Sequence, residues 1–202
     1  KEDWWQFDFL MRTLGKFAKE QQNVLIILNE PVDLAGSLIQ IFKKKRKKIC
    51  KRHNLTFLYA QDLWPNVRWS NNYSGWLNQQ ILKILASSCV KTKNYVVLDS
   101  KNFFIAPFTG DEILNSEPNR LIGYSANRIK TAKFYCDLFD VDIKQKFLQN
   151  ITPFVMKTET AIQLVEHFGG TEKFATWFLK HQADGFSPME FNLYDVFSKY
   201  IG

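Results

Sequence analysis

The chain is poor in the residues that would indicate a disulfide framework or a zinc site. Only three of its 202 residues are cysteines, Cys50, Cys89 and Cys136, and no two of them form a CxxC pair. Disulfide frameworks use an even and larger number of cysteines, and structural zinc sites use CxxC pairs, so the sequence disfavours both classes. We therefore expect a protein of the reducing cytoplasm.

Long apolar runs are also lacking. No stretch approaches the roughly 20 apolar residues that cross a bilayer, and no signal peptide is recognisable. The composition, 46% hydrophobic and 23% charged, is that of an ordinary globular protein. The sequence therefore predicts one domain over residues 1–202, with enough apolar material for a sizeable core.

Positive charge is present in excess and is unevenly spread. The formal net charge is +7, and "KKKRKK" (43–48) with Lys51 and Arg52 supplies eight of the 27 basic residues. Three interpretations stay open for residues 43–52. They form a solvated helix face, they contact anionic lipid at the inner membrane face, or they bind nucleic acid. No nucleic-acid motif accompanies them, so we do not expect nucleic acid as a partner.

Apolar spacing predicts alternating helices and strands. Helices are expected over 2–20, 31–53, 73–90, 158–168, 171–182 and 188–200, and strands over 23–28, 55–60, 95–99 and 152–156. Strand and helix alternate through the first hundred residues, which is typical of an α/β fold with a mostly parallel sheet flanked by helices.

The stretch "YVVLDSKNFF" (95–104) places a carboxylate where a buried strand ends. Ligands of open α/β sheets bind beyond the carboxyl ends of the strands, so Asp99 is a candidate site residue. The alternative is an aspartate that caps a helix or a turn.

The helix before that strand has two faces. Leu77, Ile81, Ile84, Leu85 and Ser88 share one arc and predict the core face. A second arc carries Trp76, Gln79, Gln80 and Lys83. An aromatic ring, two amides and an ammonium could hold a ligand with phosphate and hydroxyl groups, although a solvated helix face has the same composition.

Four motifs together resemble a known family. They are "QQILK" (79–83), "VVLDSKNFF" (96–104), "ITPFVM" (151–156) and "SPMEFNLYDVF" (187–197). In this order they resemble GT-A-type nucleotide-sugar glycosyltransferases, and more narrowly a glycosyltransferase-like family from bacterial surface-polysaccharide loci and marine microbial genomes. The resemblance covers nearly the whole chain and implies a Rossmann-like, single-domain fold. Such folds open with a strand, so we expect that the first strand is missing here.

The resemblance implies a function and a site. A sugar would pass from a nucleotide-sugar donor to a saccharide or lipid-linked acceptor. Asp99 would bind the donor diphosphate and a divalent cation, Mn²⁺ or Mg²⁺. The helix residues Trp76, Gln79, Gln80 and Lys83 would line the donor pocket. Glu190 would act on an acceptor hydroxyl, with Thr152 and Tyr194 beside it.

Lys101 departs from the family pattern. A metal-binding DxD motif has its second carboxylate at this position, and here only Asn102 offers a further oxygen. Two interpretations follow. Either the Lys101 ammonium stands in for the cation against the diphosphate, or the site binds without turnover. The alternative function is therefore a non-catalytic GT-A-like module that binds a glycan or a protein.

Two further interpretations concern single segments. In "SPME", Ser187 could be a helix N-cap, Pro188 the first helical residue and Glu190 the third residue of a capping box, which would explain Glu190 without catalysis. The aromatic loop over 63–73 could cover the donor through Trp64, Arg68, Trp69 and Tyr73.

Overall fold

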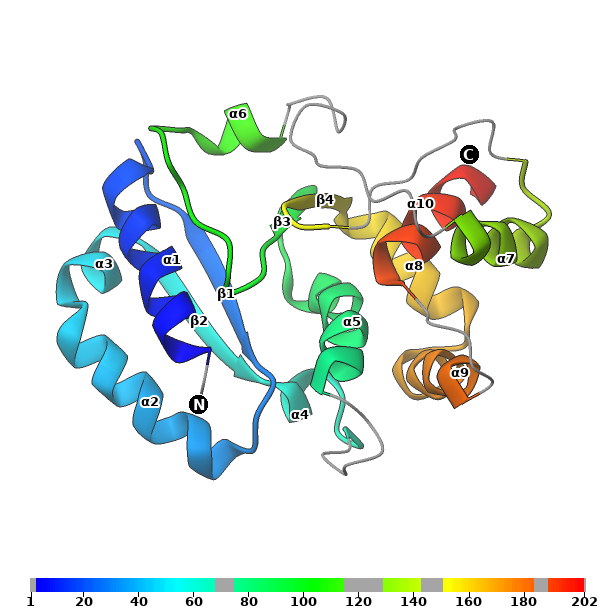
Figure 1. Cartoon of the computed structure of the whole chain (residues 1–202), viewed down its shortest axis with the longest axis horizontal. Coiled ribbons are helices and arrows are strands. Elements are labelled where there is room, and N and C mark those ends of the chain that lie inside the picture. The colour runs from blue at the N-terminus through cyan, green and yellow to red at the C-terminus, as the bar shows by residue number, and fades with distance from the viewer. Residues whose placement is uncertain (1–2, 68–74, 115–128, 143–150, 184–188, 202) are drawn as a thin grey trace.

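The first third of the chain forms a small parallel sheet with helices beside it. The computed structural model describes residues 3–67, 75–114, 129–142, 151–183 and 189–201. The first elements are α1 (Trp4–Phe17), β1 (Asn23–Leu28), α2 (Val32–Lys45), α3 (Lys47–Arg52), β2 (Asn54–Tyr59) and α4 (Ala60–Leu63). Strands β1 and β2 pair in parallel from Asn23↔Asn54 to Leu28↔Tyr59. Figure 1 shows α1, α2 and α3 together at the left of the molecule.

The rest of the described chain, from Gly75 onward, is mostly helical. Its elements are α5 (Gly75–Leu85), the 3₁₀ helix η1 (Ala86–Cys89), β3 (Asn94–Val97), α6 (Gly110–Leu114), α7 (Ile129–Phe139), β4 (Phe154–Lys157), α8 (Thr158–His167), α9 (Thr171–Ala183) and α10 (Glu190–Tyr200). Strands β3 and β4 pair antiparallel, from Asn94↔Lys157 to Val97↔Phe154. In Figure 1 this short sheet lies between the parallel strands β1 and β2 and the helices α7 to α10.

The mixed α/β class is confirmed, but the single, mostly parallel sheet is wrong for the described residues. They contain two sheets of two strands, and only β1 and β2 run parallel. After β3 the chain does not enter a crossover helix. It runs back along α1, where Phe108 and Ala18 form an isolated bridge. Alternation of strand and helix gives the order of elements, but it does not give the partner of each strand.

Most element boundaries agree with the expected ranges, with three informative differences. The helix expected over 31–53 breaks at Arg46, whose backbone lies at φ −116° and ψ 36°. Its guanidinium pairs with Asp8 of α1. Strand β3 ends at Val97, so Asp99 lies in the turn that follows. Strand β4 begins at Phe154, after a cis peptide bond between Thr152 and Pro153.

The main core lies among α5, α8, α9 and α10. The expected core face of α5 is confirmed, because Leu77, Ile81, Ile84 and Leu85 are all buried, although Ser88 is exposed. Phe154 of β4 stacks on Phe191 of α10, with ring centroids 4.2 Å apart. This contact brings the start of α10 over the short sheet and thereby positions Glu190.

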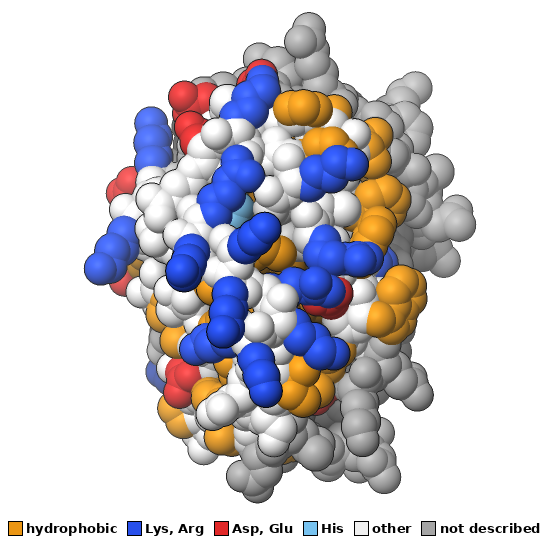
Figure 2. All heavy atoms as spheres, turned by 90° about the vertical axis from the view of Figure 1, so that its left-hand side faces the viewer, with side chains coloured by type: hydrophobic (Ala, Val, Ile, Leu, Met, Phe, Trp, Pro, Cys, Tyr) orange, Lys and Arg blue, Asp and Glu red, His pale blue; other side chains and the backbone are white. Residues whose placement is uncertain are grey.

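The surface of α1, α2 and α3 is strongly basic. Figure 2 shows many Lys and Arg side chains across this face and few acidic ones. Within the described residues, no helix has both the length and the apolar character needed to cross a membrane. The three cysteines are free thiols.

Candidate functional site

Three predicted site residues from different elements meet at one ammonium. Lys83 Nζ of α5 lies 3.0 Å from Asp99 Oδ1, after β3, and 3.0 Å from Glu190 Oε1, at the start of α10. The side chains of Lys83, Asp99 and Glu190 are 11%, 16% and 1% exposed. We call these three residues the buried triad. Asp99 is its member closest to solvent.

Aromatic residues hold Lys83 in place. Its ammonium lies 5.0 Å from the centre of the Phe191 ring, the distance of a cation–π contact. The Tyr95 hydroxyl of β3 lies 3.1 Å from the Lys83 carbonyl oxygen, to which it donates, and 3.0 Å from Met156 Sδ of β4. Helix α5, both strands of the short sheet and α10 are therefore joined around the buried triad.

A tight turn presents Asp99. The Asp99 N–H donates to Asn102 Oδ1 at 2.7 Å, and the Asn102 N–H donates to the Asp99 carbonyl at 2.9 Å. The Thr152 hydroxyl donates to Asp99 Oδ2 at 3.0 Å. Lys101 Nζ lies 3.7 Å from the same oxygen, and its side chain is 72% exposed. Asp99 thus has one buried and one exposed ammonium beside it.

The electrostatics of the buried triad are those of two carboxylates sharing one cation. Burial raises the pKa of Glu190, and Lys83 offsets part of this rise. Burial alone would lower the pKa of Lys83, but attraction from Glu190 and Asp99 outweighs it and raises that pKa above its usual value. Glu190 Oε2 is buried and accepts no hydrogen bond from any described residue. Lys83 therefore stays charged at neutral pH and is the main partner of Glu190.

The donor set does not fit the divalent cation that the resemblance implies. Lys83 lies between the two carboxylates, and the Asn102 amide oxygen is engaged by the Asp99 backbone. The described ranges contain no group of three or more His, Cys, Asp or Glu side chains arranged to hold a metal. The Lys83 ammonium lies where a cation between the two carboxylates would sit, and Lys101 stands where the second carboxylate of a DxD motif would be.

The other donor-pocket candidates on α5 lie in different environments. Gln80 is 2% exposed, and its amide nitrogen donates to the Trp76 carbonyl at 3.1 Å, so its side chain is engaged within its own helix. Gln79 is half-buried, and the Trp76 side chain is 41% exposed. Among the predicted donor-side residues of α5, Lys83 is the one that contacts both Asp99 and Glu190 in the part of the chain that the structure describes.

The two predicted acceptor-side residues, Thr152 and Tyr194, also lie in different environments. Thr152 contacts Asp99, as described above, although it was expected on the opposite side of the site. Tyr194 is buried, and its hydroxyl accepts the Lys157 N–H at 2.7 Å, which ties α10 to β4.

The capping-box interpretation of Glu190 is wrong, because α10 begins at Glu190 itself with Met189 as its N-cap. Ser187 and Pro188 lie outside the described residues.

The aromatic loop over 63–73 is only partly described. Trp64 is buried at 3% exposure, and its indole N–H donates to Glu172 at 3.3 Å, so its expected role as an exposed contact is wrong. Arg68, Trp69 and Tyr73 lie outside the described residues.

Sequence reasoning missed Phe191, whose ring supports Lys83, although it directly follows the predicted Glu190.

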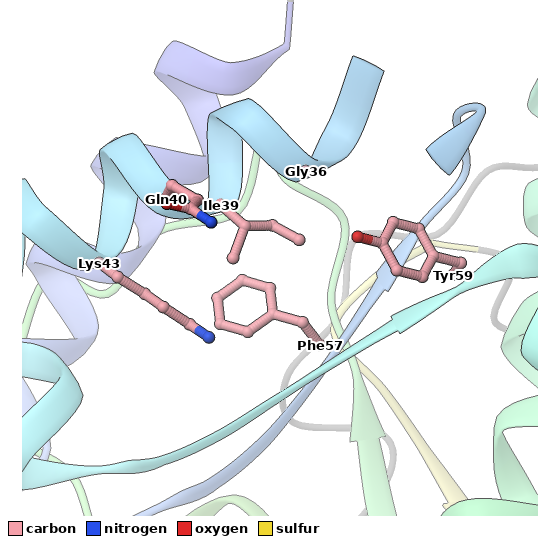
Figure 3. Close-up of a pocket in the computed structure, with 6 residues that line it drawn as sticks. All are labelled: Gly36, Ile39, Gln40, Lys43, Phe57 and Tyr59. Atoms are coloured by element: carbon pink, nitrogen blue, oxygen red, sulfur yellow. The ribbon is translucent and has the colours of Figure 1, made fainter. Parts of the chain in front are cut away.

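A separate hollow of about 590 Å³ lies between α2 and β2 (Figure 3). It is lined by Gly36, Ile39, Gln40, Lys43, Phe57 and Tyr59. Figure 3 shows the Lys43 side chain extending toward the Phe57 ring, and its Nζ lies 5.1 Å from the ring centre. The lining offers an ammonium, an amide and a phenol but no carboxylate. The buried triad therefore carries the richer chemistry.

Comparison with known proteins gives a family but no function. No curated protein and no solved structure matches the chain. One family model, described as a family of unknown function (DUF6492), matches residues 1–201. That match includes the buried triad, Lys101 and the basic segment over 43–52. The chain belongs to the DUF6492 family.

Proposed function

We propose that the chain is a glycosyltransferase that moves a sugar from a nucleotide-sugar donor to a saccharide or lipid-linked acceptor. The observation that carries the proposal is the meeting of Lys83, Asp99 and Glu190 at one ammonium. These residues come from three of the four motifs that resemble GT-A-type enzymes. Their convergence supports the resemblance, because motifs that matched by chance would have no reason to meet.

The exposed end of the site suits a diphosphate. In the transfer, the bond from the anomeric carbon to the diphosphate oxygen breaks, and its electron pair leaves with the diphosphate. The acceptor oxygen bonds to that carbon, and its proton is released to water. Negative charge grows on the leaving group, so a nearby cation stabilises the transition state. Lys101, largely exposed and 3.7 Å from Asp99, is the residue that we assign to this role.

We propose that Asp99 and Lys101 touch the donor. The other two members of the buried triad, Lys83 and Glu190, position them. Asp99 holds Lys101 near its Oδ2 and can accept a hydrogen bond from a sugar hydroxyl. Glu190 is 1% exposed, so in this arrangement it does not reach an acceptor. We assign it the role of holding Lys83, which in turn orients Asp99. Among the predicted donor-side residues of α5, the side chains of Trp76 and Gln79 are exposed or half-buried, so they can extend the donor pocket.

The second candidate is a non-catalytic binding module of the same fold class. One observation favours it, namely that the carboxylate expected to act on the acceptor is buried. A module of this kind would bind a glycan or a protein and release no nucleotide.

A thermal-shift screen separates the two candidates. We expect one of UDP-, GDP-, CMP- or dTDP-sugars to raise the melting temperature, because a ligand that binds only the folded state stabilises it by about 2.7 kcal/mol at 100 times its Kd. Each sugar is tested with and without Mn²⁺. A shift without Mn²⁺ supports Lys101 as the cation.

Matched variants locate the binding. Asp99→Asn should abolish the shift, whereas Asp137→Asn, which changes an exposed carboxylate on α7, should keep it. If no donor shifts the folded wild-type chain, the transferase proposal fails and the binding module takes its place.

A further inference from the structure

Helix α1 presents an uncovered outer face. Trp5, Phe9, Arg12 and Lys16 follow one another at spacings of four, three and four residues, which places them along one stripe. All four are exposed, with Trp5 at 69% and Phe9 at 38%. The opposite face of α1 is buried through residues such as Met11. The helix is thus packed on one side and open on the other.

Basic residues border this stripe on one side. Arg46 forms two hydrogen bonds with Asp8 of α1, at 2.7 and 2.6 Å, and Arg52 donates to the Gly15 carbonyl at 2.8 Å. Helix α3 and the end of α2 therefore lie directly beside α1. Their exposed cations are Lys43, Lys44, Lys45, Lys47, Lys48, Lys51 and Arg52. We call these seven residues, with Arg12 and Lys16, the basic face.

Apolar residues border the stripe on the other side. The Phe104 N–H donates to the Thr13 hydroxyl of α1 at 3.1 Å, which holds the chain after Lys101 against the helix. The Phe103 ring meets the Phe9 ring edge-on, with centroids 5.4 Å apart. Phe103 is 55% exposed and Ile105 is 79% exposed. We call Trp5, Phe9, Phe103 and Ile105 the apolar ridge.

Charge is concentrated on this part of the chain. Residues 1–54 hold 12 Lys and Arg against six Asp and Glu, which gives +6 of the formal net charge of +7. The carboxylate of Asp8, in α1, pairs with Arg46 at 2.6 Å and with Arg12 at 3.7 Å, so its negative charge is neutralised. Figure 2 shows the basic side chains spread over this surface and hydrophobic side chains along its right-hand edge.

We propose that the apolar ridge and the basic face together dock the chain onto an anionic lipid bilayer. Each Lys or Arg near such a surface is attracted to acidic headgroups, and this attraction accumulates over the basic face. Exposed Trp, Phe and Ile side chains enter the boundary between headgroups and acyl chains. A nucleic acid would engage the positive charge but would leave the aliphatic Ile105 without a partner.

The docking surface adjoins the candidate site. Ser100, next to Asp99, lies with its hydroxyl 3.4 Å from Gln6 Oε1 of α1. Lys101 and Phe103 are separated by one residue. Docking would thus bring Asp99 and Lys101 close to the bilayer, where a lipid-linked acceptor would lie. This last step rests on the proposed function, whereas the docking itself does not.

Vesicle flotation tests the proposal without any nucleotide. The chain is mixed with phosphatidylcholine vesicles that either contain or lack phosphatidylserine. We expect binding to the phosphatidylserine vesicles alone, and loss of most of it near 1 M salt, where the screening length falls to about 3 Å. Lys47→Glu with Lys48→Glu should lower the partition coefficient of the chain onto phosphatidylserine vesicles by at least about tenfold. Trp5→Ser with Ile105→Ser should also weaken it.

Matched controls keep the test specific. Lys91→Glu with Lys93→Glu changes two exposed lysines between η1 and β3, and Leu138→Ser changes an exposed apolar residue of α7. Both controls should bind as the wild type does. The proposal is overturned if phosphatidylserine vesicles do not bind the folded chain, or if either the basic-face variant or the ridge variant binds as the wild type does. It is also overturned if an oligonucleotide binds while vesicles do not.

Discussion

Lys83→Met is expected to lower the free energy of unfolding by about 3 to 5 kcal/mol. The change leaves Asp99 and Glu190 without the cation they share, and Glu190 is almost fully buried. A buried carboxylate without a partner loses its hydration and gains nothing in return. Urea unfolding at pH 7, followed by circular dichroism, measures the effect.

The pH dependence of this effect has a defined sign. The pKa of Lys83 is raised in the folded state, so the ammonium stabilises the fold fully below its unfolded pKa, near 10.5. That stabilisation is lost as the pH rises through the higher folded pKa. The difference between wild type and Lys83→Met should therefore be largest near neutrality and should shrink above about pH 10.5.

A triple variant distinguishes charge from packing. Lys83→Met combined with Asp99→Asn and Glu190→Gln removes all three charges and should recover most of the lost stability, since an uncharged replacement of a buried ion pair is often neutral. If the triple variant is as unstable as Lys83→Met alone, the loss comes from packing around Phe191 and the electrostatic account is wrong.

Lys101→Met is expected to lower the rate of sugar transfer by about 10²- to 10³-fold, the cost of removing one group that stabilises developing negative charge. Stability should hardly change, because Lys101 is largely exposed and an exposed ion pair contributes about 0 to 1 kcal/mol. Release of the nucleoside mono- or diphosphate from the donor identified by thermal shift measures the rate.

Two companion variants sharpen this result. Lys91→Met removes an exposed lysine outside the site and should leave the rate unchanged. Lys101→Asp restores the second carboxylate of a DxD pair, so its activity should be low and should rise when Mn²⁺ is added. Full activity of Lys101→Met would show that Lys101 does not carry the charge of the leaving group.

The local elements of the fold could be predicted because their signals are local. The apolar run over 23–28 and the helical spacing over 158–168 correspond closely to β1 and α8. The sheet could not be predicted, because strand pairing depends on segments that are distant in the sequence. Val96 pairs with Val155 in an antiparallel ladder, and no pattern near either residue specifies that partner or direction.

The candidate site was predictable in its members but not in its arrangement. Asp99, Lys83 and Glu190 were each expected at a site, on the strength of strand ends, helix faces and the resemblance. Their ion pairs arise because the stacked rings of Phe154 and Phe191 fix α10 over β4, and that packing is a tertiary property. For the same reason, the burial of Glu190 and the contact of Thr152 with Asp99 could not be inferred from spacing.

Photoaffinity labelling tests the central claim, that a nucleotide sugar binds beside the buried triad, most directly. The chain is irradiated with azido derivatives of the four nucleotide sugars, and the labelled peptides are identified by mass spectrometry. We predict labelling within residues 76–83 or 99–102 that the unmodified donor competes away. Labelling around Tyr59 in the hollow between α2 and β2, or no labelling that the donor competes away, would contradict the claim.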